Sequence, residues 1–334
     1  MKDRHVVVTG RRRVLTIVAG FGAALLIPGA ASARRPGRFE WRGSALGAEA
    51  RIVLCHRDRA RVAEAIGVVV AEIRRLEREF SLHRPDSALS LLNSKGFLRH
   101  PSLDMLRVLQ EGYRFGELSG GAFDITVQPL WQIYADHFAA DPDDETGPPA
   151  AAVEGARRLV DYRRLRIAPD RIGLDEGMAI TLNGIAQGYV TDRAADLLRS
   201  RGWSHVLIDL GELRALGGTA EGRPWSAGLR DPDDGRRLLV TIPLLDRAAA
   251  TSAGAAARFD RLGRHHHLFD PATGQSAHLY RSVTVIADRA TVADALSTAL
   301  SVLPRDAAPD LLRRAGAAEA WFVRLDGGVE HLPC

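Results

Sequence analysis

The spacing of hydrophobic residues along the chain predicts both helices and strands. Apolar positions recur every three or four residues over 60–80 and again over 103–118, which is typical of amphipathic helices, and the second run ends at the helix-stopping pair Gly120-Gly121. Helices are also predicted over 188–201 and 292–303. Short β-branched or aromatic runs predict strands at 50–55, 206–209, 282–287 and 320–325.

These elements alternate irregularly, which favours an α+β fold over a doubly wound parallel sheet. The acidic stretch 141–149, which contains proline and glycine, is predicted to be a surface loop. No internal repeat is visible, and the chain lacks both the GxGxxG and the GxxxxGK[ST] patterns. The two commonest nucleotide-binding loops are therefore excluded.

The N-terminus has the layout of an export leader. Three arginines at 11–13 precede an apolar run over 14–27, and small residues follow at 31–33. The run is shorter than the ~20 apolar residues of a membrane-spanning helix. Adjacent arginines with only moderate hydrophobicity after them resemble a twin-arginine signal. We therefore expect residues 1–33 to be a twin-arginine-type signal peptide and the protein to be periplasmic or otherwise extracytoplasmic; an uncleaved membrane anchor is the alternative.

The leader also accounts for the net charge. The chain has 334 residues, of which 46% are hydrophobic and 26% charged, and it carries a formal charge of +4. Residues 1–33 hold five basic side chains against one acidic, so the remainder is neutral overall and gives no electrostatic reason to bind nucleic acid. The only cysteines, Cys55 and Cys334, exclude a thiolate-rich zinc or iron–sulfur site.

The first candidate site lies in the predicted helix over 292–303. Asp294 and Thr298 are four residues apart and share one helix face. A carboxylate and a hydroxyl on one face suit a hard cation such as Mg²⁺, which takes oxygen ligands. The competing interpretation is structural: Asp294 would cap the helix start, and Thr298 would hydrogen-bond to a backbone carbonyl.

Glycine turns mark two further candidate segments. Gly184 and Gly188 flank small residues before a predicted helix, where backbone amides can meet an anion; an ordinary strand-to-helix turn is the alternative. Phe123 and Asp124 follow Gly120-Gly121 and offer an aromatic face and a carboxylate to a ligand. The alternative there is a core phenylalanine in a helix–turn–strand connection.

A histidine-rich segment is the last candidate. Three consecutive histidines at 265–267 precede Asp270, which begins an Asp-Pro-x-x-Gly turn. Adjacent residues point in different directions, so we expect one inward histidine at the end of a strand rather than a metal tract. Upstream, Thr251 and Ser252 place two hydroxyls beside Gly254. A Gly-x-Ser-x-Gly elbow is absent, so Ser252 is not interpreted as an esterase nucleophile.

The order and spacing of these segments resemble one family. From about residue 43 to residue 328 the chain is similar to the FAD:protein FMN transferases, the ApbE-like flavin transferases. The resemblance rests on Ser44-Ala45-Leu46-Gly47, residues 86–90 with Leu92-Asn93, Gly121-Ala122-Phe123-Asp124, Gly184-Ile185-Ala186 with Gly188-Tyr189, Ala250-Thr251-Ser252, His267 with Asp270-Pro271 and Thr273-Gly274, residues 282–285, and Ala293-Asp294 through Thr298.

This resemblance implies an α+β fold of mixed, mostly antiparallel sheets with packed helices, in a two-lobed single catalytic unit over 34–334. It also implies a reaction in which the FAD pyrophosphate is cleaved, FMN is joined through phosphate to a Ser or Thr of a target protein, and AMP is released. FAD is then a substrate and Mg²⁺ the cofactor. The implied partner is the flavin-bearing domain of an exported redox protein, through which the chain would associate peripherally with a membrane.

The resemblance also implies roles for individual residues. Mg²⁺ is expected at Asp294, Thr298 and the backbone carbonyl of Gly184. The candidate base for the attacking hydroxyl is His267, or failing it Asp270, because a histidine near its reference pKa of ~6.5 suits that task. The residues expected to hold FAD are Leu46, Ala122, Phe123, Asp124, Thr181, Gln187, Thr251, Ser252 and Leu268.

The sequence departs from the family pattern at two of these positions. Thr181 stands where Asp is usual, and Gln187 stands where Lys or Glu is common. Losing an Asp and a Lys together leaves the net charge near the site unchanged. Two other functions use the same residues: an FAD pyrophosphatase that releases FMN and AMP to water, and a non-catalytic FAD-binding protein.

Overall fold

The computed structural model describes residues 15–17 and 37–334. Most of the expected signal peptide, residues 1–33, therefore lies outside the described residues. Its three described residues form β1 (Leu15–Ile17), which pairs antiparallel with β9 (Trp225–Arg230). In the described part of the chain, no helix is both long and apolar enough to cross a membrane.

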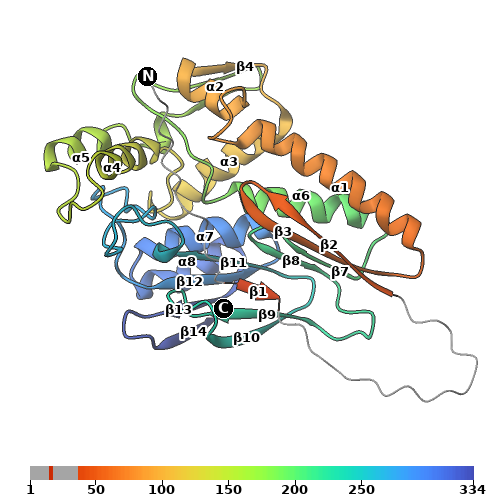
Figure 1. Cartoon of the computed structure of the whole chain (residues 1–334). Helices are drawn as coiled ribbons and strands as arrows, with labels where there is room; N and C mark the ends of the chain where they lie inside the picture. Colours follow the sequence, from red (N-terminus) through yellow and green to blue (C-terminus); the bar gives the residue numbers. More distant parts are fainter. Residues whose placement is uncertain (1–14, 18–36) are drawn as a thin grey trace, which may run out of the picture.

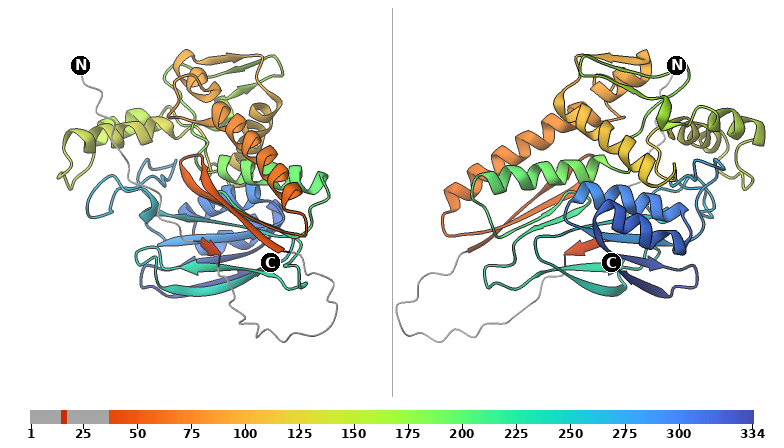
Figure 2. Two further views of the ribbon diagram at one scale, coloured as in Figure 1. Left: turned by 45° about the vertical axis from the view of Figure 1, so that its right-hand side comes forward. Right: turned by 180° about the vertical axis from the view of Figure 1, so that it is seen from behind.

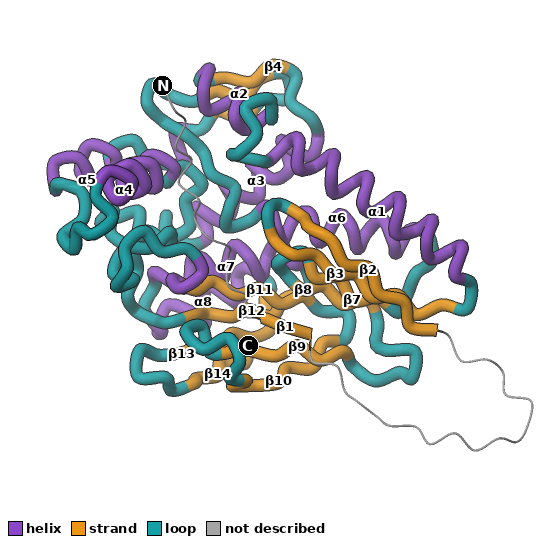
Figure 3. The backbone as a smooth tube through the Cα atoms, in the orientation of Figure 1, coloured by secondary structure: helices purple, strands orange, loops and turns teal. Residues whose placement is uncertain are grey.

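The described strands form three sheets. Two of them lie below most of the helices in Figures 1 and 3, whereas the small sheet that contains β4 (Phe97–Arg99) lies at the top. Every pair of neighbouring strands is antiparallel, so the predicted α+β class with mostly antiparallel sheets is confirmed. The largest sheet has the order β14 (Val329–Pro333), β13 (Ala317–Val323), β12 (Ser282–Ala287), β11 (Ala248–Ala253), β8 (Leu213–Leu216), β7 (Val206–Asp209), β3 (Ala48–His56), β2 (Gly37–Ala45). The smaller sheets are β1-β9-β10, with β10 at Leu238–Leu244, and β4 (Phe97–Arg99), β6 (Arg171–Gly173), β5 (Arg166–Ile167).

The helices connect and cover these sheets. In chain order they are α1 (Arg59–Phe80), α2 (Ala88–Lys95), α3 (Leu103–Leu118), α4 (Gln128–Ala140), α5 (Ala150–Arg157), α6 (Ala186–Ser200), α7 (Ala290–Val302) and α8 (Ala308–Ala315), with short 3-10 turns at Tyr162–Arg164, Gly254–Ala256 and Arg305–Ala307. The helices predicted over 60–80, 103–118, 188–201 and 292–303 are α1, α3, α6 and α7, and the predicted loop 141–149 joins α4 to α5. The strand predicted at 320–325 is β13, which begins and ends earlier in the chain.

The central strands of the large sheet are buried on both faces. Along β3, Ile52 and Leu54 pack into the core shared with the helices, whereas Val53 packs into a second core with residues of β9 and β10. Successive strand residues point to opposite faces, so one strand serves both cores. Figure 2 shows α1, α6 and α7 layered over one face of the strands, with β9 and β10 on the other side.

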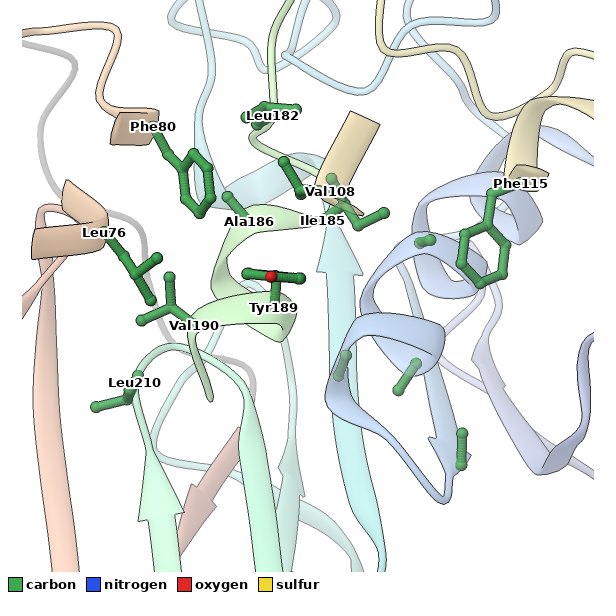
Figure 4. Packing of buried hydrophobic residues seen from close by; sticks show 14 of the residues in the cluster. Leu76, Phe80, Val108, Phe115, Leu182, Ile185, Ala186, Tyr189, Val190 and Leu210 are labelled. Carbon is green, nitrogen blue, oxygen red and sulfur yellow. The ribbon is translucent and has the colours of Figure 1, made fainter. Parts of the chain in front are cut away.

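The start of α6 is anchored in the helix-side core. Leu182 and Ile185 in the preceding turn are buried, and so are Ala186 and Tyr189 in the first turn of the helix. Figure 4 shows these side chains gathered beside Phe80 of α1, whose ring meets that of Tyr189 edge to face at 5.8 Å. The predicted glycine turn is therefore anchored by a packed cluster of apolar side chains.

Helices α6 and α7 cap one another. The backbone N–H of Gly188, in the first turn of α6, donates to the Asp294 carboxylate of α7 at 2.9 Å. In return, Asp192 of α6 accepts from the N–H groups of Ala290 and Thr291, the first residues of α7, each at 2.9 Å. The first N–H groups of a helix have no partner within that helix, so each carboxylate satisfies donors that the other helix leaves open.

Gly188 lets the two helices approach this closely. A Cβ built on Gly188 would lie 2.4 Å from the backbone oxygen of Ala290 and 2.8 Å from the Cβ of Asp294. Backbone atoms of a packed helix cannot move aside cheaply, so any side chain at Gly188 must push α7 away from α6.

We expect Gly188→Ala to destabilise the protein by about 1–3 kcal/mol or more, the usual range for an overpacked core. The matched control is Gly67→Ala in α1, where a new Cβ meets nothing within 4 Å, so better helix propensity is expected to stabilise the fold by up to about 1 kcal/mol. Urea unfolding followed by circular dichroism measures both. Equal changes in the two variants would contradict the close approach described here.

Candidate active site

Two adjoining hollows lie between the helices, the end of β11 and the loop that follows it. The first is lined by the 122–127 loop, the turn before α6, the end of β11, one face of α7 and residues of the 256–271 loop. The second lies beside α1, α2 and the β2–β3 turn. Four residues line both, and they mark the junction of the hollows: Trp131, Asn183, Gln187 and His267.

The fold gathers nearly all the predicted site residues around these hollows. The first is lined by Ala122, Phe123, Asp124, Thr181, Gly184, Gln187, Thr251, Ser252, His267, Leu268, Asp294 and Thr298. Leu46 lines the second hollow. Asp270 lines neither, although Phe269 and Pro271 on either side of it line the first.

The three predicted metal-binding positions meet at one wall of the first hollow. A Cβ built on Gly184 would lie 3.0 Å from Thr298 Oγ1, so the glycine turn lies directly against the face of α7 that carries Thr298. Asp294, one turn earlier on the same face, is 4% exposed. Its carboxylate caps α6, whereas the N-cap residue of its own helix makes no side-chain capping hydrogen bond, and the Thr298 hydroxyl is hydrogen-bonded to Ser252 Oγ at 3.1 Å rather than to a carbonyl. The structural interpretation weighed for this pair is therefore not what the fold shows.

This wall offers oxygen donors of mixed kind. In the described residues there is no group of three or more His, Cys, Asp or Glu side chains placed to hold a metal ion. The set at Gly184, Asp294 and Thr298 instead consists of a backbone carbonyl, a carboxylate and a hydroxyl. All three are hard oxygen donors, the type that Mg²⁺ prefers.

The histidine segment divides into a structural and an accessible member. His266 is 5% exposed; its Nε2 donates to the carbonyl of Ala277 at 2.8 Å, and its Nδ1 accepts from the N–H of Leu268. His267 is half-buried and lines both hollows. The expectation that one histidine ends a strand is wrong in detail, because this segment forms only isolated bridges, Arg258 with His266 and Phe269 with Ser276.

The ring of His267 is oriented by the backbone. Its Nδ1 lies 3.1 Å from the carbonyl oxygen of Ala257. A carbonyl only accepts, so Nδ1 carries the proton and, in the neutral ring, the lone pair is on Nε2. That tautomer is the one a general base needs, with its basic nitrogen directed away from the anchoring carbonyl.

The carboxylate of Asp270 is used within its own turn. It accepts from the N–H of Ala272 at 2.9 Å and from the hydroxyl of Thr273 at 3.0 Å, while its backbone carbonyl accepts from the N–H of Gly274. The predicted Asp-Pro-x-x-Gly turn is thus present, and Asp270 stabilises it. Of the two candidate bases, the geometry favours His267.

Asp124 also has a structural task. Its carboxylate accepts from the backbone and hydroxyl of Thr126, at 2.8 and 2.6 Å, and from the N–H of Tyr162 at 3.0 Å. Burial raises the pKa of this carboxyl, and those three hydrogen bonds oppose the rise. Asp124 therefore shapes the loop that carries Phe123, besides lining the hollow itself.

Leu46 occupies a strained turn at the rim of the second hollow. Leu46 and Gly47 join β2 to β3, and both have positive φ, 48° and 75°, as a type I′ hairpin turn requires. The backbone N–H of Leu46 donates to Oε1 of Glu77 on α1 at 2.6 Å. That hydrogen bond holds the turn against the helix and keeps the leucine side chain at the rim.

Sequence reasoning missed several residues that the fold brings to the site. Trp131 and Asn183 lie at the junction of the hollows, and Arg74, Arg78 and Arg84 line the second one. Asn183 could have been predicted from the sequence, because it adjoins Gly184 in a segment that was already a candidate site. The three arginines carry no sequence signal, since exposed arginines on an amphipathic helix and its following loop are normal.

Comparisons with known proteins show the family. Residues 46–322 match the model of the ApbE family. This chain belongs to the ApbE family. The predicted family and the predicted enzyme class, a transferase, are thereby confirmed. The chain is 32% identical over 303 residues to an FAD:protein FMN transferase from Treponema pallidum, covering 83% of this chain and 82% of the relative. A protein of the same name from Vibrio cholerae is 32% identical over 273 residues, covering 78% and 80%.

Solved structures of the family share the fold. The ApbE protein from Thermotoga maritima superimposes with a TM-score of 0.79 at 29% identity, covering 88% of this chain and 96% of that one. The apo form of the flavinyl transferase ApbE from Pseudomonas stutzeri gives a TM-score of 0.77 at 28% identity, covering 91% and 96%. The ApbE-like architecture predicted from the sequence is therefore confirmed.

The buried histidine makes stability depend on pH. Burial, reinforced by the neighbouring His278, lowers the pKa of His266 from 6.5 to about 4. At pH values between these two pKa values, His266 is protonated in the unfolded chain and neutral in the folded chain. We expect full stability above pH 6.5 and a loss of about 3 kcal/mol from this group as the pH falls to 4.

The measurement is the urea midpoint from pH 4 to pH 8 for the native protein and for His266→Gln, whose amide can still donate to Ala277. The difference between the two proteins isolates this histidine from all other titrating groups. A difference that stays constant over the whole range would show that His266 does not titrate as described.

Proposed function

We propose that this protein is a Mg²⁺-dependent FAD:protein FMN transferase that attaches FMN through a phosphoester to a Ser or Thr of an acceptor protein and releases AMP. The observation that carries the proposal is the meeting, in one hollow, of a hard oxygen donor set and a histidine in the basic tautomer. The relatives named FAD:protein FMN transferase support the same reaction. Hydrolysis of FAD and storage of FAD remain the competing functions.

The residues present fit a Mg²⁺ ion. Gly184 has no side chain to crowd a phosphate, and the turn it belongs to lies against Thr298. One carboxylate oxygen of Asp294 accepts from Gly188, and a carboxylate has further lone-pair sites for a cation. Asp294, Thr298 and the carbonyl of Gly184 would hold the ion, which would offset the negative charge that develops on the diphosphate oxygens.

The remaining residues account for the other needs of phosphoryl transfer. His267 takes the proton of the acceptor hydroxyl while the oxygen of that hydroxyl forms a bond to the flavin-side phosphorus. The bond from that phosphorus to the bridging oxygen breaks, and AMP leaves with the bridging oxygen. Such reactions depend mainly on positioning and charge neutralisation. Phe123 at 3% exposure gives the first hollow a rigid aromatic wall.

The second hollow gives an extended dinucleotide room beyond the reacting phosphorus. It adjoins the first at His267 and Gln187, and it is bordered by the exposed side chains of Arg74, Arg78 and Arg84. Arginine forms charge-assisted bonds with phosphate oxygens. We place one half of FAD in each hollow, with the diphosphate between them, near the junction.

We further propose that the protein acts outside the cytoplasm on the flavin-bearing domain of an exported redox protein, and meets the membrane only through that acceptor. The support is the leader-like sequence of residues 1–33, with its arginines at 11–13 and small residues at 31–33.

One incubation separates the three functions. The protein is mixed with FAD, Mg²⁺ and a candidate acceptor domain, and the products are resolved by denaturing gel and by chromatography. Flavin fluorescence on the acceptor band with release of AMP supports transfer. Free FMN and AMP in the presence of a competent acceptor would replace the proposal by hydrolysis, and intact FAD would replace it by storage.

We expect Asp294→Asn to abolish transfer. The amide keeps the size of the side chain and can still accept from the N–H of Gly188, but it removes the only carboxylate of the proposed cation site. Acceptor-band fluorescence measures the rate, and circular dichroism with urea unfolding checks that the fold is retained. Transfer at the native rate would show that the cation site is wrongly placed.

We expect His267→Ala to slow transfer by about 10²–10⁴-fold, the usual contribution of a general base, while FAD binding is retained. Stopped assays give the rate, and quenching of flavin fluorescence gives the affinity. His265→Ala is the control, since His265 lines neither hollow. An unchanged rate in His267→Ala would assign the base to another group.

A further inference from the structure

Three hydroxyl groups and one carbonyl form a continuous chain behind the candidate cation site. Thr298 Oγ1 lies 3.1 Å from Ser252 Oγ, which lies 2.8 Å from Ser297 Oγ. Ser297 Oγ in turn donates to the backbone carbonyl of Asp294 at 3.0 Å. The chain thus runs from the wall of the first hollow into the packed interior between β11 and α7.

The carbonyl at the inner end of this hydroxyl chain determines which way its hydrogen bonds run. A hydroxyl has one hydrogen to donate, whereas a carbonyl can only accept. Because Ser297 gives its hydrogen to the Asp294 carbonyl, it can only accept from Ser252. Ser252 has then used its own hydrogen, so it can only accept from Thr298. All three hydrogens point away from the hollow.

Burial makes this direction costly to reverse. Ser297 is fully buried and Ser252 is 9% exposed, so water cannot readily replace a lost partner. The opposite direction would leave the hydroxyl hydrogen of Thr298 pointing into the hollow and would remove the bond to the Asp294 carbonyl. A buried polar network keeps the arrangement in which every donor has an acceptor.

We propose that Ser252 and Ser297 are positioning residues that orient the Thr298 hydroxyl with its lone pairs toward the hollow, so that it can bind a divalent cation. This rests on the proposed function, because the cation is the one proposed at Gly184, Asp294 and Thr298. A neutral hydroxyl binds a cation only through its oxygen lone pairs, and a hydrogen aimed at the ion would repel it. Residues behind metal ligands commonly set ligand orientation in this way.

The test uses Mn²⁺ alone as the probe, with free Mn²⁺ measured by electron paramagnetic resonance during titration. In Ser297→Ala the Ser252 hydroxyl loses its acceptor and turns its hydrogen to Thr298. We expect the affinity for Mn²⁺ to fall by about 10-fold or more, the usual effect of losing an outer partner of a metal ligand. Ser252→Ala should show a similar loss.

The matched control is Ser301→Ala. Ser301 lies one turn further along α7, is also buried, and donates to the carbonyl of Ser297 at 2.7 Å, but it stands outside the hydroxyl chain. It should lower the thermal unfolding midpoint about as much as Ser297→Ala and leave Mn²⁺ affinity unchanged. The double variant Ser252→Ala/Ser297→Ala should lose no more affinity than Ser252→Ala alone, because both changes break one chain.

The outcomes separate this inference from the proposed function. If the native protein binds Mn²⁺ and Ser297→Ala binds it as tightly as Ser301→Ala does, the orienting role is wrong while the cation site stands. Additive losses in the double variant would likewise overturn the chain. If the native protein binds no Mn²⁺, with or without FAD, the cation site and the orienting role fail together.

Discussion

The geometry of the site depends on the exchange of caps between α6 and α7. Asp192 and Asp294 each satisfy backbone donors that the other helix leaves open, so neither helix can shift without exposing buried N–H groups. Arg214 and Arg289 lie 3.7 and 3.3 Å from Asp192 and offset its buried charge. Gly188 sets the distance between the helices by having no side chain. This contact positions the glycine turn before α6 and the hydroxyl of Thr298, and it places both beside the end of β11. A few capping hydrogen bonds thus determine how segments far apart in sequence meet at the site.

Much of the fold follows from local patterns. The helices α1 and α3 have apolar residues at regular helical spacing, so their existence and approximate bounds were predictable. Helices α6 and α7 were also predicted near their observed bounds, although α7 is buried around most of its circumference. Short buried strands such as β7 and β12 were predictable because β-branched residues cluster there between turn signals. The pairing order of the large sheet was not predictable, because neighbours such as β3 with β7 and β8 with β11 are far apart in sequence and no local pattern specifies their pairing.

The site divides in the same way. Residues that belong to short motifs, such as Asp294 with Thr298, could be singled out by spacing. Asp192 and Ser297 could not, because their importance lies in partners on other elements: Asp192 acts on the start of a helix about a hundred residues later, and Ser297 acts through a strand. The sequence also could not show that His266 is buried while His267 lines the hollows. Two adjacent residues of the same type differ only in the direction in which the backbone points their side chains.

The β2–β3 turn has one more consequence. A hairpin of this type is most stable with asparagine or glycine at its first central position, and leucine there carries a backbone penalty. The Glu77 hydrogen bond offsets part of that penalty from outside the hairpin. The chain therefore gives up some folding free energy to present an apolar side chain at the rim of the second hollow. At Leu46, an unfavourable backbone conformation and the placement of an apolar side chain at the surface are therefore coupled.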